Sequence, residues 1–88
     1  MKTLHILRKR KDTFAEAAIC SEAASEGNGH DVAVLLIQDA VLGSPAVPVP
    51  VYANKQDLEA RGVQREYPAI HYAQICQMIL DHDRTIVW

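Results

Sequence analysis

The sequence predicts a single three-layer α/β/α domain, residues 1–88, with a mainly parallel sheet of about five strands. Strand-like and helix-like segments alternate along the whole chain, as in proteins built from right-handed crossovers between parallel strands. The segment Asp31–Gln38, DVAVLLIQ, is almost continuously apolar, which is typical of a strand covered on both faces. The chain is 49% hydrophobic but has one Phe and one Trp, so aliphatic side chains must form most of the core.

The first half of the chain has the clearest signals. Thr3–Leu7 is rich in β-forming residues and predicts the first strand. A helix should follow, because Ala and Glu dominate the next segment and Thr13 stands three residues before Glu16, as in a capping box. Gly27 or Gly29 is expected to end this helix.

The middle of the chain predicts shorter elements. Three prolines after the second strand allow at most one helical turn, so an extended connection should lead to a third strand at residues 49–52. Asn54 is expected to cap a two-turn helix over residues 55–61. Gly62 should take the left-handed conformation that ends this helix.

The end of the chain predicts a short strand near Ala69–His71, a helix over residues 72–83 and a final strand, TIVW. Four side chains of the last helix share a helical spacing and should form its buried stripe: Tyr72, Ile75, Cys76 and Ile79.

Charge limits the classes of partner. The net charge of −2 argues against a general polyanion binder, but one basic run lies between the end of a strand and the start of a helix. Anions and polar partners are commonly bound at such places in parallel α/β proteins. Arg8, Lys9, Arg10 and Lys11 are therefore either a solvated loop or a contact for an anion or a partner, with RNA and an acidic protein surface both open.

Neither a membrane span nor a metal site is expected. No run of eighteen apolar residues occurs, and the apolar segment near Met1 is too short for a signal peptide. Two cysteines without a CxxC spacing are typical of free thiols in a reducing compartment, so a cytoplasmic location is predicted. No metal or other cofactor is expected, because the histidines have no ligand-like spacing: His5, His30, His71 and His82.

Five segments carry a family resemblance: LHIL (4–7), LLIQDAV (35–41), VYANKQDLEARG (51–62), IHYAQI (70–75) and TIVW (85–88). Their order and spacing resemble the DsrE/DsrF/DsrH sulfur-relay proteins, and within that family the DsrH (TusB) branch. The resemblance covers nearly the whole chain. One departure is the connection at residues 42–50, which is shorter and richer in proline than the family's helical crossover.

The resemblance implies a DsrEFH-like α/β/α fold, assembly with DsrE-like and DsrF-like subunits or with itself, and transfer of persulfide sulfur between proteins. In one branch of this system the sulfur reaches the wobble uridine of certain tRNAs as 2-thiouridine. In another branch it belongs to dissimilatory sulfur oxidation. We therefore expect a sulfur carrier or a structural subunit more than an independent enzyme. The sequence shows no nucleophile with an adjacent base, which an independent enzyme of this kind would need.

Cys20 is the candidate sulfur acceptor, because some DsrH-type proteins have a cysteine at a matching place in the first helix. A sulfur carrier needs an accessible thiolate. The helix dipole acts within the first turn, which Cys20 lies beyond, and Glu16 one turn earlier opposes a negative charge. Cys20 is thus either a packed thiol without chemistry or a persulfide site, whereas Cys76 is expected to fill the core.

A subunit interface is the last prediction. The inward face of the first helix should comprise Phe14, Ala17, Ala18, Ser21 and Ala24. Ile19 and Ala23 would then point outward, as would Met78 on the last helix, and such apolar side chains favour contact with a partner. The alternative to a sulfur-relay subunit is therefore a homo-oligomeric binding or scaffold module of the same fold without sulfur chemistry.

Overall fold

A computed structural model gives the structure of residues 2–26 and 31–88. The elements in chain order are β1 (Lys2–Leu7), α1 (Thr13–Glu26), β2 (Asp31–Leu36), the 3₁₀ turn η1 (Gln38–Leu42), β3 (Val51–Asn54), α2 (Lys55–Ala60), β4 (Ala69–Ile70), α3 (Tyr72–Asp81) and β5 (Arg84–Val87). The strands form one sheet in the order β4-β3-β2-β1-β5, and every neighbouring pair is parallel. The predicted α/β class with a parallel sheet of five strands is confirmed.

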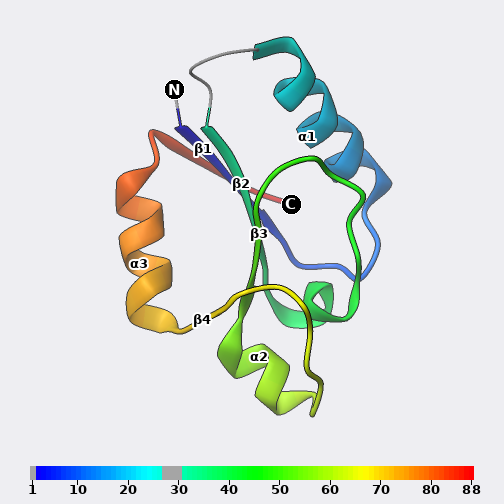
Figure 1. The fold of residues 1–88 in the computed structure, drawn as a ribbon, viewed down its shortest axis with the longest axis vertical. Helices are drawn as coiled ribbons and strands as arrows, with labels where there is room; N and C mark the ends of the chain where they lie inside the picture. The colour runs from blue at the N-terminus through cyan, green and yellow to red at the C-terminus, as the bar shows by residue number, and fades with distance from the viewer. Residues whose placement is uncertain (1, 27–30) are drawn as a thin grey trace.

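Helices cover both faces of the sheet, with α1 on one side and α3 on the other (Figure 1). Successive residues of β2 divide between the two faces, as the pleat requires. Val34 belongs to the cluster that contains Ala15 and Ile19 of α1, whereas Leu35 belongs to the cluster against which Ile75 and Met78 of α3 pack.

The two central pairings differ in length. β1 pairs with β2 from Lys2↔Asp31 to Leu7↔Leu36, over the whole of both strands. β3 pairs with β2 only from Val34↔Val51 onward. The third strand therefore begins two residues later than predicted, and the first three residues of β2 extend beyond it.

The predicted orientation of α1 is wrong. Ala15 and Ile19 are completely buried, whereas Phe14, expected to face inward, is 82% exposed. Ile19 lies in the chain's own core and is not available to a partner, and Ala23 is half-buried. The pattern misled because alanines occur all around this helix, so size and hydrophobicity hardly distinguish its faces.

The start of α1 also differs from the prediction. The carboxylate of Asp12 accepts a hydrogen bond from the N–H of Ala15 at 3.0 Å, so Asp12 caps the helix instead of Thr13. The helix extends to Glu26, and the predicted stops at Gly27 and Gly29 lie outside the described residues.

The predicted buried stripe of α3 is wrong as well. Tyr72 is 77% exposed and Ile79 40% exposed, while Ile75 and Met78 pack against the core. Met78 therefore faces the sheet and not the outside. A second helical spacing, i, i+3 and i+7, joins Ile75, Met78 and His82. Ile75 and Met78 of this second stripe are the residues that pack against the sheet.

Several local predictions are confirmed. The side chain of Asn54 accepts a hydrogen bond from the N–H of Gln56 and caps α2. Gly62 has a φ of 63°, the left-handed conformation expected after this helix. The connection after β2 differs slightly, because η1 is a 3₁₀ helix of five residues and exceeds the one helical turn predicted.

Candidate functional site

Cys20 lies on the flank of α1, half-buried, where the connection between η1 and β3 passes over the helix. Its thiol donates a hydrogen bond to the main-chain oxygen of Ala46, with Sγ and oxygen 3.3 Å apart. The sulfur is therefore neither in the core nor fully in solvent.

Glu16 holds the same connection one turn earlier. One of its oxygens accepts a hydrogen bond from the N–H of Ala46 at 3.3 Å, and the other lies 3.5 Å from the ammonium of Lys11. Both main-chain groups of Ala46 are thus bound by α1, one through Glu16 and one through Cys20. We call Lys11, Glu16, Cys20 and Ala46 the Cys20 patch.

The basic loop packs against this connection. A Cβ atom added to Gly43 would lie 2.1 Å from the main-chain oxygen of Arg10, so the close approach requires glycine. The connection thus contacts the basic run through Gly43 and Cys20 through Ala46, and Lys11 pairs with Glu16 one turn before Cys20.

The rest of the basic run is exposed at the carboxyl end of β1. Arg8, Lys9 and Arg10 are exposed, and Nε of Arg8 donates to the main-chain oxygen of Trp88 at 2.5 Å. This contact places the loop beside the end of β5, so the carboxyl ends of the neighbouring strands β1 and β5 meet there. Ligands commonly bind at such positions of parallel sheets.

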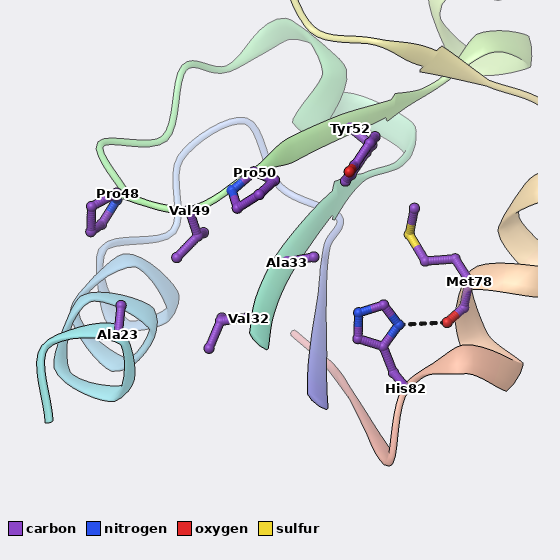
Figure 2. A pocket seen from close by; sticks show the side chains of 9 residues that line it. All are labelled: Ala23, Val32, Ala33, Pro48, Val49, Pro50, Tyr52, Met78 and His82. Atoms are coloured by element: carbon purple, nitrogen blue, oxygen red, sulfur yellow. Dashed lines mark hydrogen bonds between the residues drawn. The ribbon is translucent and has the colours of Figure 1, made fainter. Parts of the chain in front are cut away.

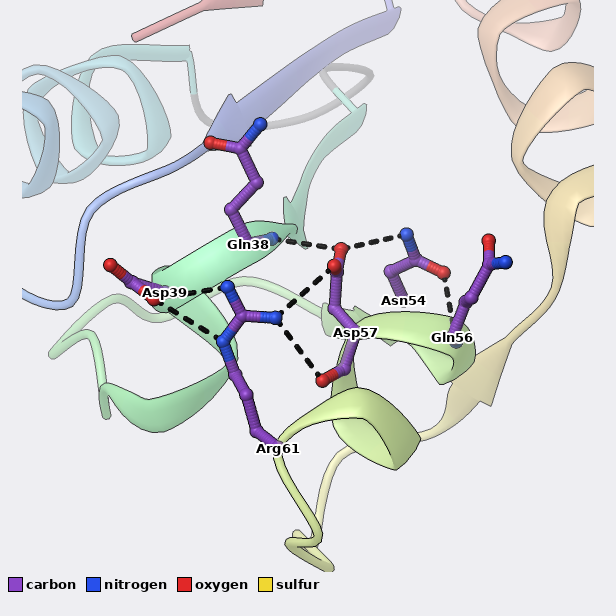
Figure 3. A network of polar contacts seen from close by, with 6 residues as sticks. All are labelled: Gln38, Asp39, Asn54, Gln56, Asp57 and Arg61. Carbon is purple, nitrogen blue, oxygen red and sulfur yellow. Dashed lines mark hydrogen bonds and ion pairs between the residues drawn. The ribbon is translucent and has the colours of Figure 1, made fainter.

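A second polar cluster occupies the carboxyl ends of β2 and β3 (Figure 3). One oxygen of Asp57 accepts hydrogen bonds from the N–H of Gln38 and the amide of Asn54, both at 2.8 Å. Arg61 bridges Asp57 and Asp39 at 3.3 and 3.0 Å. Gln38 has a φ of 52°, an uncommon conformation for a residue other than glycine, and the bond to Asp57 holds it. These contacts fix the turn after β2 to α2.

A third cluster was not predicted. His5 is 2% exposed on β1; its Nε2 lies 2.7 Å from Glu22 of α1, and the indole N–H of Trp88 donates to its Nδ1 at 3.1 Å. Because Nδ1 accepts, Nε2 carries the hydrogen and donates to Glu22. Glu22 also binds Arg84 of β5 at 3.1 Å. Both nitrogens of His5 are engaged, so this cluster ties α1 to the sheet and offers no free base.

Glu22 is the most perturbed acid in this cluster. Burial alone would raise its pKa, but the hydrogen bonds from His5, Thr3 and Arg84 outweigh burial and lower the pKa from 4.5 to about 2. Glu22 follows Ala15 and Ile19 at i+7 and i+3 and shares their buried side of α1, a side that the sequence did not identify.

Among the described residues no group of three or more His, Cys, Asp or Glu side chains is arranged to hold a metal ion. In the same part of the chain no helix is long and apolar enough to cross a membrane. Comparisons with family models, with curated proteins and with solved structures found no match. The DsrH-like resemblance therefore stays a prediction.

Proposed function

We propose that this chain is a subunit of a sulfur-relay assembly in which Cys20 accepts sulfur as a persulfide. The observation that carries the proposal is the half-buried Cys20 thiol, held by Ala46 of a connection that also contacts the exposed basic loop. A carrier cysteine needs a sulfur that a donor can reach but that bulk solvent does not freely bathe. Cys76 lies on the other side of the sheet, where α3 has no comparable run of basic residues.

The transfer is a thiol–persulfide exchange. The Cys20 thiol loses its proton, and the thiolate attacks the outer sulfur of a donor persulfide. A new sulfur–sulfur bond forms at Cys20, and the bond in the donor breaks. The donor departs as a thiol with the proton, so the exchange needs no external oxidant or reductant.

The main-chain oxygen of Ala46 has a defined part in this exchange. It accepts a hydrogen bond from the Cys20 thiol. A thiolate would face that oxygen without a hydrogen between them, so the connection over Cys20 has to move before attack. The exposed ammonium of Lys11 and the neighbouring basic side chains can then attract the anionic donor persulfide.

The assembly and the destination of the sulfur follow from the resemblance. Partners of DsrE-like and DsrF-like type, or further copies of this chain, would supply and receive the sulfur, with tRNA 2-thiolation or sulfur oxidation as the end use. A cytoplasmic location belongs to the same proposal, since both described cysteines are free thiols.

The test is to incubate the protein with a small-molecule persulfide donor and to measure its intact mass. Wild type should become heavier by one sulfur atom, and a thiol acceptor should remove that atom again. Cys20→Ser should gain none, while the control Cys76→Ser should behave as wild type. A sulfur adduct that persists in Cys20→Ser would refute the assignment.

A second candidate, a homo-oligomeric scaffold, is favoured by the outer side of α3. Tyr72 and Leu80 are 77% and 78% exposed there, and Ile79 is 40% exposed. Contiguous apolar side chains of this kind are typical of protein contacts. Light scattering should detect a dimer or larger species that Leu80→Glu dissociates. Phe14→Glu on α1, changed at a position of similar exposure, is the control that should leave the oligomer intact.

A further inference from the structure

A cavity of about 380 Å³ lies beside the first residues of β2, the middle strand of the sheet. Figure 2 shows its walls, which come from α1, α3, β2 and the start of β3. None of the three polar clusters described above lines it. The lining residues are Ala23, Val32, Ala33, Pro48, Val49, Pro50, Tyr52, Met78 and His82.

The cavity exists because β3 begins late. β3 pairs with β2 only from Val34 onward, and the chain bends at Pro48 and Val49. The space that an earlier start of β3 would occupy is left between the two helical layers. The cavity therefore lies beyond the start of β3, between the α1 side and the α3 side of the sheet.

The main chain of β2 offers a donor and an acceptor to this space. The N–H of Val34 points toward β3, where it donates to Pro50 at 2.9 Å. In a parallel strand, alternate residues direct their N–H and C=O to the same neighbour, so both groups of Val32 point to the same side. Among the described residues, no main-chain hydrogen bond joins Val32 to the segment from Pro48 to Pro50. A donor and an acceptor that the described part of the chain next to β2 does not bind favour a ligand that bonds to both.

The two broad walls suit a flat ring. Ala23 and Val49 lie on the α1 side, and Met78 and His82 lie on the α3 side (Figure 2). Nδ1 of His82 donates to the main-chain oxygen of Met78 at 2.6 Å, because a carbonyl can only accept. The other ring nitrogen, Nε2, points into the cavity and is an acceptor when the ring is neutral. The Met78 thioether can pack against the face or edge of an aromatic ring.

We propose that this cavity binds a small, flat, largely apolar molecule with an amide edge, such as a ring lactam or a cyclic ureide. The ring lies in the plane of the sheet between the two walls. Its carbonyl accepts from the N–H of Val32, and its adjacent N–H donates to the C=O of Val32. The volume lies within the range of small-molecule sites, about 300 to 1,000 Å³. This site is independent of the sulfur chemistry proposed for Cys20.

The probe for the test is 2-pyridone. N-methyl-2-pyridone is its matched control, because the methyl group replaces the ring N–H donor and adds bulk at the amide edge. In ¹H–¹⁵N spectra of the full chain, 2-pyridone should shift the amide of Val32 downfield with a Kd on the order of 1 mM. N-methyl-2-pyridone should bind at least tenfold more weakly. Equal shifts from both compounds, or none from either, would overturn the proposal.

Two variants locate the binding. Ala23→Met fills the cavity from α1 and should weaken 2-pyridone at least tenfold, while Ala24→Met, changed at the exposed neighbouring position, should not. Thermal unfolding checks that both variants fold. If a short extended peptide shifts Val32 and 2-pyridone does not, the site is a strand edge for protein partners and the small-molecule proposal fails.

Discussion

The two faces of the sheet are covered to very different degrees. On the α1 face, Ala15 and Ile19 of the helix are completely buried, and the residues of η1 and α2 extend the same cluster. On the other face, α3 has no buried residue at all and carries large apolar side chains on its outer side. The core beneath α1 is thus fully buried, whereas α3 covers its face of the sheet only partly.

Polar contacts strengthen the contrast. The α1 face is tied to the sheet by the buried contact of His5 with Glu22 and by Arg84. On α3, by contrast, the side chain of Gln77 donates a hydrogen bond to Asp81 of the same helix and not to the sheet. We therefore expect side chains on the α1 face to contribute more to the free energy of unfolding than those on the α3 face.

The largest expected effect tests the two cores directly. Ile19→Ala should lower the free energy of unfolding by about 3 to 4 kcal/mol, because it opens a cavity in the core beneath α1. Ile75→Ala, at a half-buried position of α3, should cost about 1 to 2 kcal/mol. Denaturant titrations measure both values, and equal losses would remove the difference between the faces.

The next effect depends on pH. Because the pKa of Glu22 is about 2 in the folded protein and 4.5 otherwise, Glu22 stabilises the fold above pH 4.5, and this stability is lost as the pH falls toward 2. The pKa difference corresponds to roughly 3 kcal/mol. Glu22→Gln should lose most of this at neutral pH and show a flatter dependence of stability on pH between 4.5 and 2. Parallel pH curves for the two proteins would contradict the role given to Glu22.

A smaller effect is expected at the strand ends. Asp57→Ala should cost about 1 to 2 kcal/mol, since it leaves the N–H of Gln38 and the amide of Asn54 without their shared acceptor. Asp39→Ala removes only an exposed ion pair with Arg61 and should cost less than about 0.5 kcal/mol. Thermal unfolding of the two variants ranks them, and the reverse order would show that Asp57 does not organise the turn.

The smallest expected effect has the opposite sign. Gln38→Gly should stabilise the protein by up to about 1 kcal/mol, because glycine adopts a φ of 52° without the steric cost that a side chain meets. Gly62→Ala, at a φ of 63°, is the matched change in the other direction and should destabilise. A loss of stability in Gln38→Gly would mean that the glutamine side chain makes contacts that compensate for its backbone conformation.

The sequence predicted the layers because each strand and helix carries its own local signal. It did not predict which side of α1 is buried, since alanine occurs on every side of that helix. In α3 two stripes had the right spacing, and only packing against β1 and β2 selected Ile75 and Met78. Periodicity thus gave the elements, but their rotation depended on the rest of the fold.

The candidate sites were less predictable, because each depends on contacts between distant residues. Cys20 could be chosen by resemblance, but its bond to Ala46 depends on the path of a proline-rich connection that has no local code. The cavity beside Val32 depends on the register between β2 and β3. A shift of that register by two residues would close the cavity.

Cys20 and Cys76 lie on the two faces just compared. A persulfide donor enriched in a heavy sulfur isotope allows the transferred sulfur to be located at either cysteine of the same protein. Peptide mass spectrometry of the wild-type protein should locate the heavy sulfur at Cys20 of α1. Cys76, on α3 beside Tyr72, should remain unlabelled. Label at Cys76 alone, equal label at both cysteines, or no label at either would contradict the proposal that this chain carries sulfur at Cys20.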